Sequence, residues 1–545
     1  MQKVFTLLLN VFLIAGCTGK QRVDLVVHNA KVYTVDSVFS VQESFAVKNG
    51  VFVAVGDNEE ILSTYAGKEE IDGRNMSIYP GFYDSHGHLF GLANLLDQVD
   101  LNGTKSVSEV IVRLQEYEKA NPEREWIIGG GWDQNLWEVK EFPVKDSLDH
   151  YFPDKPVYLS RTDYHAAWVN SKAMEAVDLD PIPKIEGGKI IIDEEKQPSG
   201  IFIDNAMDLI ARQIPLPKEA AALEMLQRAQ DSLFSSGLTS IVDAGIGETE
   251  RKLFKKLYAE DSLQIRLYGM MSVNPSNVSD VVKIKPFNSG NMSVRSVKIL
   301  ADGALGSRGA ALLDRYSDEE GTKGFLLHSP EGLETMIKKL AKTGLQINTH
   351  AIGDSANRII LDLYGKYIEP EEDRRWRIEH AQIVNPMDLD KFKAFQIIPS
   401  IQPTHATSDN EWAKRRLGER RIRYAYAYKD LLDQYGLVAL GTDFPVENYD
   451  PIRTFYAAVF RAEISESSEM GFQMENALSR EEALKGMTIW SAYACFQEND
   501  RGSIEVGKDA DFIMLDQDLM EASKEQISQA QVLRTVLAGK TVFRR

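Results

Sequence analysis

Two histidines one residue apart, His86 and His88, follow a Pro-Gly pair in the stretch GFYDSHGHLFG, residues 81 to 91. Side chains two positions apart on a strand face the same way, so Asp84, His86 and His88 would all point to one side. Imidazoles are frequent ligands of divalent metals, and two converging rings could hold one ion. The pair alone is weak evidence, because loop or core histidines can show the same spacing.

Further residues that can bind a metal follow apolar runs later in the chain. His350 lies in NTHAIGD, His380 in RIEHAQ and Asp443 in GTDFP. Four imidazoles and a carboxylate brought together would be costly to bury without a partner, and a divalent cation is such a partner. We therefore predict that these three residues join His86 and His88 in a metal site.

Lys298 lies inside an apolar run, RSVKILADG, and faces away from Val297 and Ile299. In a barrel it would point inward, where an unpaired ammonium group is strongly disfavoured. Three interpretations remain open. Lys298 could pair with a carboxylate such as Asp84 or Asp443, act as a Schiff-base or general-base lysine, or react with carbon dioxide to form a bridging carbamate.

The carbamate interpretation divides the candidate ligands between two metals. One ion would be held by His86, His88 and Asp443, and the other by His350 and His380, with carboxylated Lys298 between them.

Eight apolar, strand-like segments alternate with helical patterns, which predicts an α/β fold with a closed (β/α)8 TIM barrel. The candidate ligands fall at segment ends, and barrel enzymes carry their active sites at the carboxyl ends of the strands. The segments are 81–88, 239–245, 265–273, 295–303, 345–354, 376–382, 397–405 and 437–445.

Both ends of the chain are rich in β patterns, and Asn49-Gly50 between alternating apolar residues indicates a hairpin. Neither end has enough strands for a sheet with two buried faces, so we expect residues 23–79 and 500–545 to form one small β-sandwich domain. The barrel would then span 80–499. The stretch between its first two segments is too long for an ordinary connection, and we interpret 105–218 as an insertion after the first barrel strand.

The first residues, MQKVFTLLLNVFLIAGC, have the pattern of a signal peptide. Their ending, LIAGC, resembles a bacterial lipobox. We therefore expect residues 1–16 to be removed, Cys17 to be lipidated and 17–22 to act as a linker. The protein would be exported and anchored by lipid to the periplasmic face of a bacterial membrane or to the cell surface.

The chain has 545 residues, 43% of them hydrophobic, and a net charge of −19 without acidic blocks. This charge disfavours nucleic acid as a partner and favours a small-molecule substrate. Membrane contact is expected through the N-terminal lipid only, and the sequence leaves homo-oligomerisation open.

Several motifs together resemble the amidohydrolase superfamily, in the amidohydrolase-3 branch that includes N-substituted formamide deformylases. They occur in the family's order and are PGFYDSHGH, VKILADGALGSRGAALLD, INTHAIGD, RIEHAQ, IQPTHATSDNEW, GTDFPVE and GKDADFIMLD. The resemblance spans essentially the whole mature chain. It implies a metal-dependent barrel in which His86 and His88 are the first-strand metal pair, Lys298 occupies the bridging position, His350 and His380 are further ligands, and Asp443 is the catalytic acid/base.

These parts predict a hydrolase acting on a non-peptide C–N bond, in an amide or N-substituted formamide. The metal, one or two ions, lowers the pKa of its bound water toward neutrality, so hydroxide becomes available for attack. Zinc is the default ion, because histidine and carboxylate ligands suit it. Asp443 would accept the proton of the attacking water and return it to the leaving nitrogen. The same site could serve a deaminase or a cyclic amidase, and a non-catalytic ligand-binding lipoprotein is the alternative from another class.

Five other residues are candidates for substrate contact. His405 follows the seventh segment on the same rim. Trp132, Asp133 and His165, within the insertion, could line the pocket or serve packing and loop hydrogen bonds. Arg308 could bind a substrate carboxylate or could clamp its loop to a nearby aspartate.

Overall fold

The computed structural model describes residues 19–215, 217–369, 372–464 and 471–545. The predicted signal peptide and Cys17 lie outside these residues. In the described part of the chain, no helix is both long enough and apolar enough to cross a membrane.

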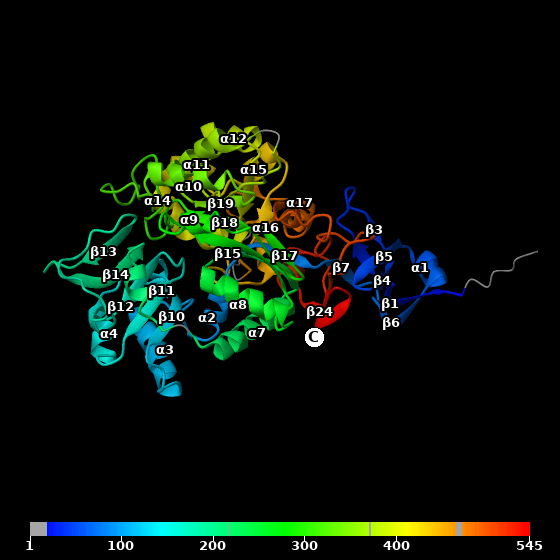
Figure 1. Ribbon diagram of the computed structural model, residues 1–545, viewed down its shortest axis with the longest axis horizontal. Helices are drawn as coiled ribbons and strands as arrows, with labels where there is room; N and C mark the ends of the chain where they lie inside the picture. Colours follow the sequence, from blue (N-terminus) through cyan, green and yellow to red (C-terminus); the bar gives the residue numbers. More distant parts are fainter. Residues whose placement is uncertain (1–18, 216, 370–371, 465–470) are drawn as a thin grey trace, which may run out of the picture.

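Eight parallel strands form the central sheet, and each of them coincides with a segment predicted from the sequence. In chain order they are β8 (Phe82–Gly87), β15 (Leu238–Ile246), β16 (Arg266–Val273), β18 (Met292–Leu300), β19 (Gln346–Ala351), β20 (Arg377–His380), β21 (Ile398–Ile401) and β22 (Ala439–Leu440). Helices pack outside them, including α7 (Glu219–Ser235), α8 (Glu248–Ala259), α10 (Pro330–Leu340) and α11 (Asp354–Tyr367). The predicted TIM barrel is therefore confirmed (Figure 1).

The first and last strands are joined through their carboxyl ends. The Asp443 N–H donates to the His86 carbonyl at 2.7 Å, and the His88 N–H donates to the Phe444 carbonyl at 2.8 Å. The buried Asp84 carboxylate also accepts from the Thr442 hydroxyl at 2.7 Å. These bonds close the barrel at the residues that were predicted to bind a metal.

A small β-rich domain is built from both ends of the chain, as predicted. A four-stranded sheet contains β1 (Gln21–His28), β4 (Ser44–Lys48), β5 (Val51–Gly56) and β6 (Tyr65–Asp72). A six-stranded sheet combines β2 (Lys31–Tyr33), β3 (Val41–Gln42) and β7 (Ser77–Pro80) with β23 (Phe512–Leu515), β24 (Val532–Leu537) and β25 (Lys540–Arg544). Apolar side chains from both sheets share one buried cluster.

The insertion after the first barrel strand has a sheet and an apolar core of its own. Its strands are β9 (Val99–Asp100), β10 (Ile127–Trp132), β11 (Val157–Arg161), β12 (Ala166–Val169), β13 (Gly188–Ile192) and β14 (Pro198–Asp204). The sheet begins before the predicted start at residue 105, because β9 pairs with β10. The insertion and the β-rich domain lie on opposite sides of the barrel (Figure 1).

Gly441 allows β22 to approach β8 closely at the point of closure. A Cβ atom at this position would lie 2.5 Å from the His86 backbone nitrogen and 2.8 Å from Asp84 Oδ1. We expect Gly441→Ala to lower the free energy of unfolding by about 1–3 kcal/mol, since a methyl group in a filled site forces its neighbours apart. Chemical denaturation measures the change. Gly321→Ala, where a Cβ atom would meet open space, is the matched control; equal stability of the two variants would contradict the prediction.

Candidate metal centre

The predicted histidines converge at the carboxyl end of the barrel. The His86 ring centroid lies 5.6 Å from that of His88 and 4.8 Å from that of His380, and His350 lies 4.6 Å from His380. The side chain of His88 is one-third exposed, whereas the other three are almost fully buried. Because of their burial, the pKa of His86 falls to about 4 and the pKa values of His350 and His380 fall well below 6.5. These three rings are therefore neutral near pH 7, as metal ligands must be.

Asp443 follows the last barrel strand and points into the cluster. Its Oδ1 lies 3.2 Å from His88 Nε2 and 3.5 Å from His86 Nε2, and its Oδ2 lies 3.2 Å from His405 Nε2. Burial by itself would raise the pKa of Asp443, but His86, His405 and His88 hold it well below its usual value. The carboxylate is thus ionised, with imidazoles on two sides.

Lys298 faces the barrel interior, as its alternation with apolar neighbours predicted. Its side chain is buried in β18, and its Nζ lies 3.1 Å from His86 Nε2. Burial lowers the pKa of Lys298 to about 8, against the opposing effect of Glu379 and Asp443. Among the described residues no ion pair within 4 Å joins it to Asp84 or Asp443, so the structure does not support the first of its three interpretations. Asp84 serves the barrel closure instead.

A buried ion pair below the cluster was missed by sequence reasoning. Glu379 forms an ion pair with Arg377, with 2.7 Å between Nε and Oε1, and its Oε2 accepts from Arg377 Nη2 at 3.0 Å and pairs with Nδ1 of His86. Burial would raise the pKa of Glu379, but Arg377 and His86 lower it to about 2. Because Nδ1 of His86 is engaged, its Nε2 faces Lys298 and the cluster. The signal in the sequence is two charged residues two positions apart in the apolar run WRIEH, directly before His380.

His405, predicted on this rim, lies in α13 (Pro403–Ser408) and is buried. Besides Asp443 it contacts Glu447, with 3.2 Å between Nδ1 and Oε1. Burial opposes protonation, but Asp443 and Glu447 raise the pKa of His405 to about 10. Glu447, four residues after Asp443, was not singled out from the sequence. Substrate contact by His405 stays a prediction.

Of the insertion residues predicted to contact substrate, one lies next to the histidine cluster and another lies in the core of the insertion. His165 lies beside His350, with 5.2 Å between ring centroids. Trp132 instead packs among Trp137 and Trp168 in the core of the inserted sheet, and its Nε1 donates to the Leu159 carbonyl. The prediction that Trp132 contacts substrate is therefore corrected, because its indole is fully enclosed there.

Two charged candidates are held by ion pairs. Asp133 pairs with the buried guanidinium of Arg161. Arg308 pairs with Asp318 at 3.1 Å and with Glu319 at 3.2 Å. The structure thus supports the loop-clamping interpretation of Arg308 over recognition of a substrate carboxylate.

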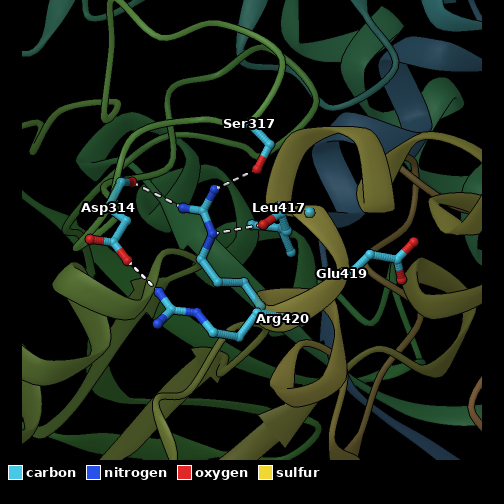
Figure 2. A pocket seen from close by; sticks show the side chains of 7 residues that line it. Asp314, Ser317, Leu417, Glu419 and Arg420 are labelled. Atoms are coloured by element: carbon cyan, nitrogen blue, oxygen red, sulfur yellow. Dashed lines mark hydrogen bonds and ion pairs between the residues drawn. The ribbon is translucent and has the colours of Figure 1, made fainter.

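A cavity of about 260 Å³ lies elsewhere on the barrel and contains none of the predicted site residues (Figure 2). In it, Arg421 donates to the carbonyl oxygens of Asp314 and Leu417 and to the Ser317 hydroxyl, and Arg420 pairs with the Asp314 carboxylate. Since these groups hold both arginines, the cavity offers a ligand no unpaired cation from Arg420 or Arg421.

The donor atoms of the cluster fit a divalent cation. His86, His88 and Asp443 offer atoms within 4.8 Å of one another, and so do His380, His405 and Asp443. The buried atoms His350 Nε2 and Asp443 Oδ1 have no hydrogen-bond partner in the described residues. Buried polar atoms without partners are costly, and a cation would satisfy both. The group of His380, His405 and Asp443 differs from the predicted second metal site, which paired His380 with His350. The Nε2 atom of His350 lies 3.6 Å from Asp302 Oδ1.

Comparison with known proteins places this geometry in a family. The amidohydrolase family matches residues 69–543. YtcJ of Bacillus subtilis, which carries an amidohydrolase name, is 31% identical over 95% of this chain and 98% of its own. The N-substituted formamide deformylase of Arthrobacter pascens is 25% identical over 96% of this chain and 98% of its own. An uncharacterized metal-dependent hydrolase from Pyrococcus horikoshii shares 28% identity and a TM-score of 0.74 over 92% of this chain and 99% of its own. The chain therefore belongs to the amidohydrolase family of metal-dependent hydrolases, as its motifs had predicted.

Proposed function

We propose that this protein hydrolyses a non-peptide C–N bond in an amide or an N-substituted formamide. The observation that carries the proposal is the buried convergence of neutral imidazoles on one ionised carboxylate at the barrel mouth. The likeness to a formamide deformylase over nearly the whole chain supports this choice of substrate.

The metal ligands in this proposal are His86, His88 and Asp443 for one ion and His350 and His380 for a second. Zinc is the proposed metal, because neutral imidazole and carboxylate suit it. When bound, such an ion lowers the pKa of water toward neutrality and polarises a carbonyl group. The barrel strands keep the donor atoms in place, which lowers the entropic cost of assembling the site.

Lys298 is proposed to carry a carboxylate group on Nζ. The ammonium group first loses one proton, and the neutral amine nitrogen then bonds to the carbon of carbon dioxide and releases a second proton, which leaves a carbamate in place of the ammonium group. Three features support this: Lys298 is buried, lacks a carboxylate partner among the described residues and lies 3.1 Å from a candidate metal ligand. The carbamate would replace a buried cation by an anionic oxygen ligand.

Asp443 is proposed to move the proton during the reaction. Its ionised carboxylate accepts a proton from the attacking water and returns it to the leaving nitrogen. An amide nitrogen leaves poorly as an anion, so this protonation is needed for cleavage. His405 lies beside the same carboxylate and helps to keep it ionised.

The function itself is tested with N-formyl and N-acetyl derivatives of one set of amines. We expect the purified protein to contain tightly bound metal and to release amine from members of this set. Removal of the metal with a chelator should abolish turnover, and added zinc should restore it. Stoichiometric metal without turnover across the whole set would contradict the proposal and favour a binding protein.

Asp443→Asn tests the proton transfer. The amide cannot accept the proton of water, so kcat should fall by roughly 10²–10⁴-fold, as expected when a general acid/base is removed. Elemental analysis checks that metal is retained. Asp314→Asn, an exposed aspartate, is the control. A kcat near that of the wild type would refute the assigned role.

Glu379→Gln tests the support of His86. Loss of the negative charge weakens the contact with Nδ1, so metal affinity should fall by about 10–100-fold, the usual effect of altering such a partner. Competition with a chromophoric chelator measures the affinity, and circular dichroism checks the fold. Glu248→Gln, on the exposed side of α8, is the control; unchanged affinity in Glu379→Gln would show that the pair serves packing alone.

A further inference from the structure

The turn between β11 and β12 brings His165 of the insertion to the barrel mouth. The two strands pair in antiparallel fashion, with Ser160 opposite Ala167, and the turn between them carries His165. Its ring lies 5.2 Å from the His350 ring, and its side chain remains 16% exposed. The insertion therefore contributes a polar group to a cluster whose other members come from the barrel.

Asp204, at the end of β14, holds this histidine. Its Oδ1 lies 2.6 Å from His165 Nδ1, and its backbone N–H donates to the His165 carbonyl at 3.1 Å. The Asp204 side chain has no exposed surface. Within the described residues, Asp204 is the hydrogen-bond partner of the His165 ring, so Nδ1 is engaged and Nε2 is left for another ligand.

The loop after β18 leaves a space shaped for the Asp204 carboxylate. A Cβ atom on Gly303 would come within 2.6 Å of Asp204 Oδ2, and one on Gly309 within 2.7 Å. Asp204 itself has a φ of 50°, a strained value for a residue with a side chain. Its Oδ2 has no hydrogen-bond partner in the described residues. Because this buried, strained carboxylate has His165 as its side-chain partner, we infer that Asp204 acts by holding the His165 ring in position.

His165 and Asp443 reach the mouth from different parts of the fold. His165 neighbours His350 of β19, whereas Asp443 follows β22, which is separated from β19 by β20 and β21. A bound amide would therefore meet the two residues from different directions.

We propose that His165 is a catalytic residue that donates a hydrogen bond from Nε2–H to the carbonyl oxygen of the scissile amide, and that Asp204 is its positioning residue. The inference rests on the proposed function, since it takes an amide as the substrate. The inserted sheet thereby completes an active site that the barrel alone leaves open on the β19 side.

Substitution of His165 is the first test. With whichever N-formyl or N-acetyl amine the wild type hydrolyses, His165→Gln should lower kcat by about 10²–10³-fold, the effect of removing one hydrogen bond to the reacting group. KM should change less than threefold and metal content should be unchanged. His150→Gln, an exposed histidine of the insertion, is the control. A kcat within threefold of the wild type, or loss of metal, would overturn the proposal.

Substitution of Asp204 tests whether it acts through His165. Asp204→Ala should lower kcat nearly as much as His165→Gln, and Asp204→Asn, which keeps one oxygen for Nδ1–H, should retain more activity. The double variant Asp204→Ala/His165→Gln should be no slower than His165→Gln alone, since coupled residues are non-additive. Multiplied losses would overturn the positioning role. Asp208→Asn, an exposed neighbour, is the control.

A nuclear magnetic resonance measurement that does not depend on turnover distinguishes this inference from the proposed function. In protein labelled with ¹⁵N-histidine, the ring signal absent from His165→Gln identifies His165. We expect it to show an Nδ1 proton in a hydrogen bond in the wild type, and to lose that bond in Asp204→Ala. An unchanged signal would overturn the positioning role. A wild type inactive on every amide would overturn the proposed function whatever this spectrum shows, and with it the role of His165 toward an amide.

Discussion

The ion pair between Arg377 and Glu379 inside the barrel holds the first histidine of the candidate metal centre in place. Two fully buried charges would each be costly alone, and as an ion pair they offset one another's charge. The second oxygen of Glu379 then binds Nδ1 of His86. With Nδ1 held in this way, Nε2 of His86 faces Lys298 and the other candidate ligands.

The hydrogen bonds that close the barrel also bring candidate metal ligands of the first and last strands together. Backbone bonds between residues 86–88 and 443–444 join the last strand to the first, and the side chains of these segments are metal-ligand candidates. Asp443 and His380 have φ values of 62° and 74°. These left-handed conformations end the strand alternation and turn the two side chains into the mouth. Such strain persists where surrounding contacts hold it, and these two residues both lie in the candidate site.

The inserted sheet both forms a core of its own and carries a histidine to the barrel mouth. One face of it forms a conventional core around Trp132 and Trp168. Its β11–β12 turn instead carries a histidine to the barrel, with a carboxylate from β14 behind it. A long insertion between the first two barrel strands can thus bring a side chain to the candidate site without altering the barrel, because barrel enzymes carry their active sites on the loops that follow the strands.

The sequence by itself determined the eight barrel strands, the sandwich of the two termini and the positions of His86, His88, Lys298, His350, His380 and Asp443. These follow from local rules: strand alternation sets which way a side chain points, and parallel strands bring their carboxyl ends together. Only the tertiary structure decided which side chains contact these residues. Glu379 meets His86 across 293 positions, and Asp204 meets His165 across 39. The enclosure of Trp132 and the clamping of Arg308 by Asp318 also depend on how loops fold back. No periodic pattern encodes such contacts, because they join segments whose spacing in the chain is unrelated to their distance in space.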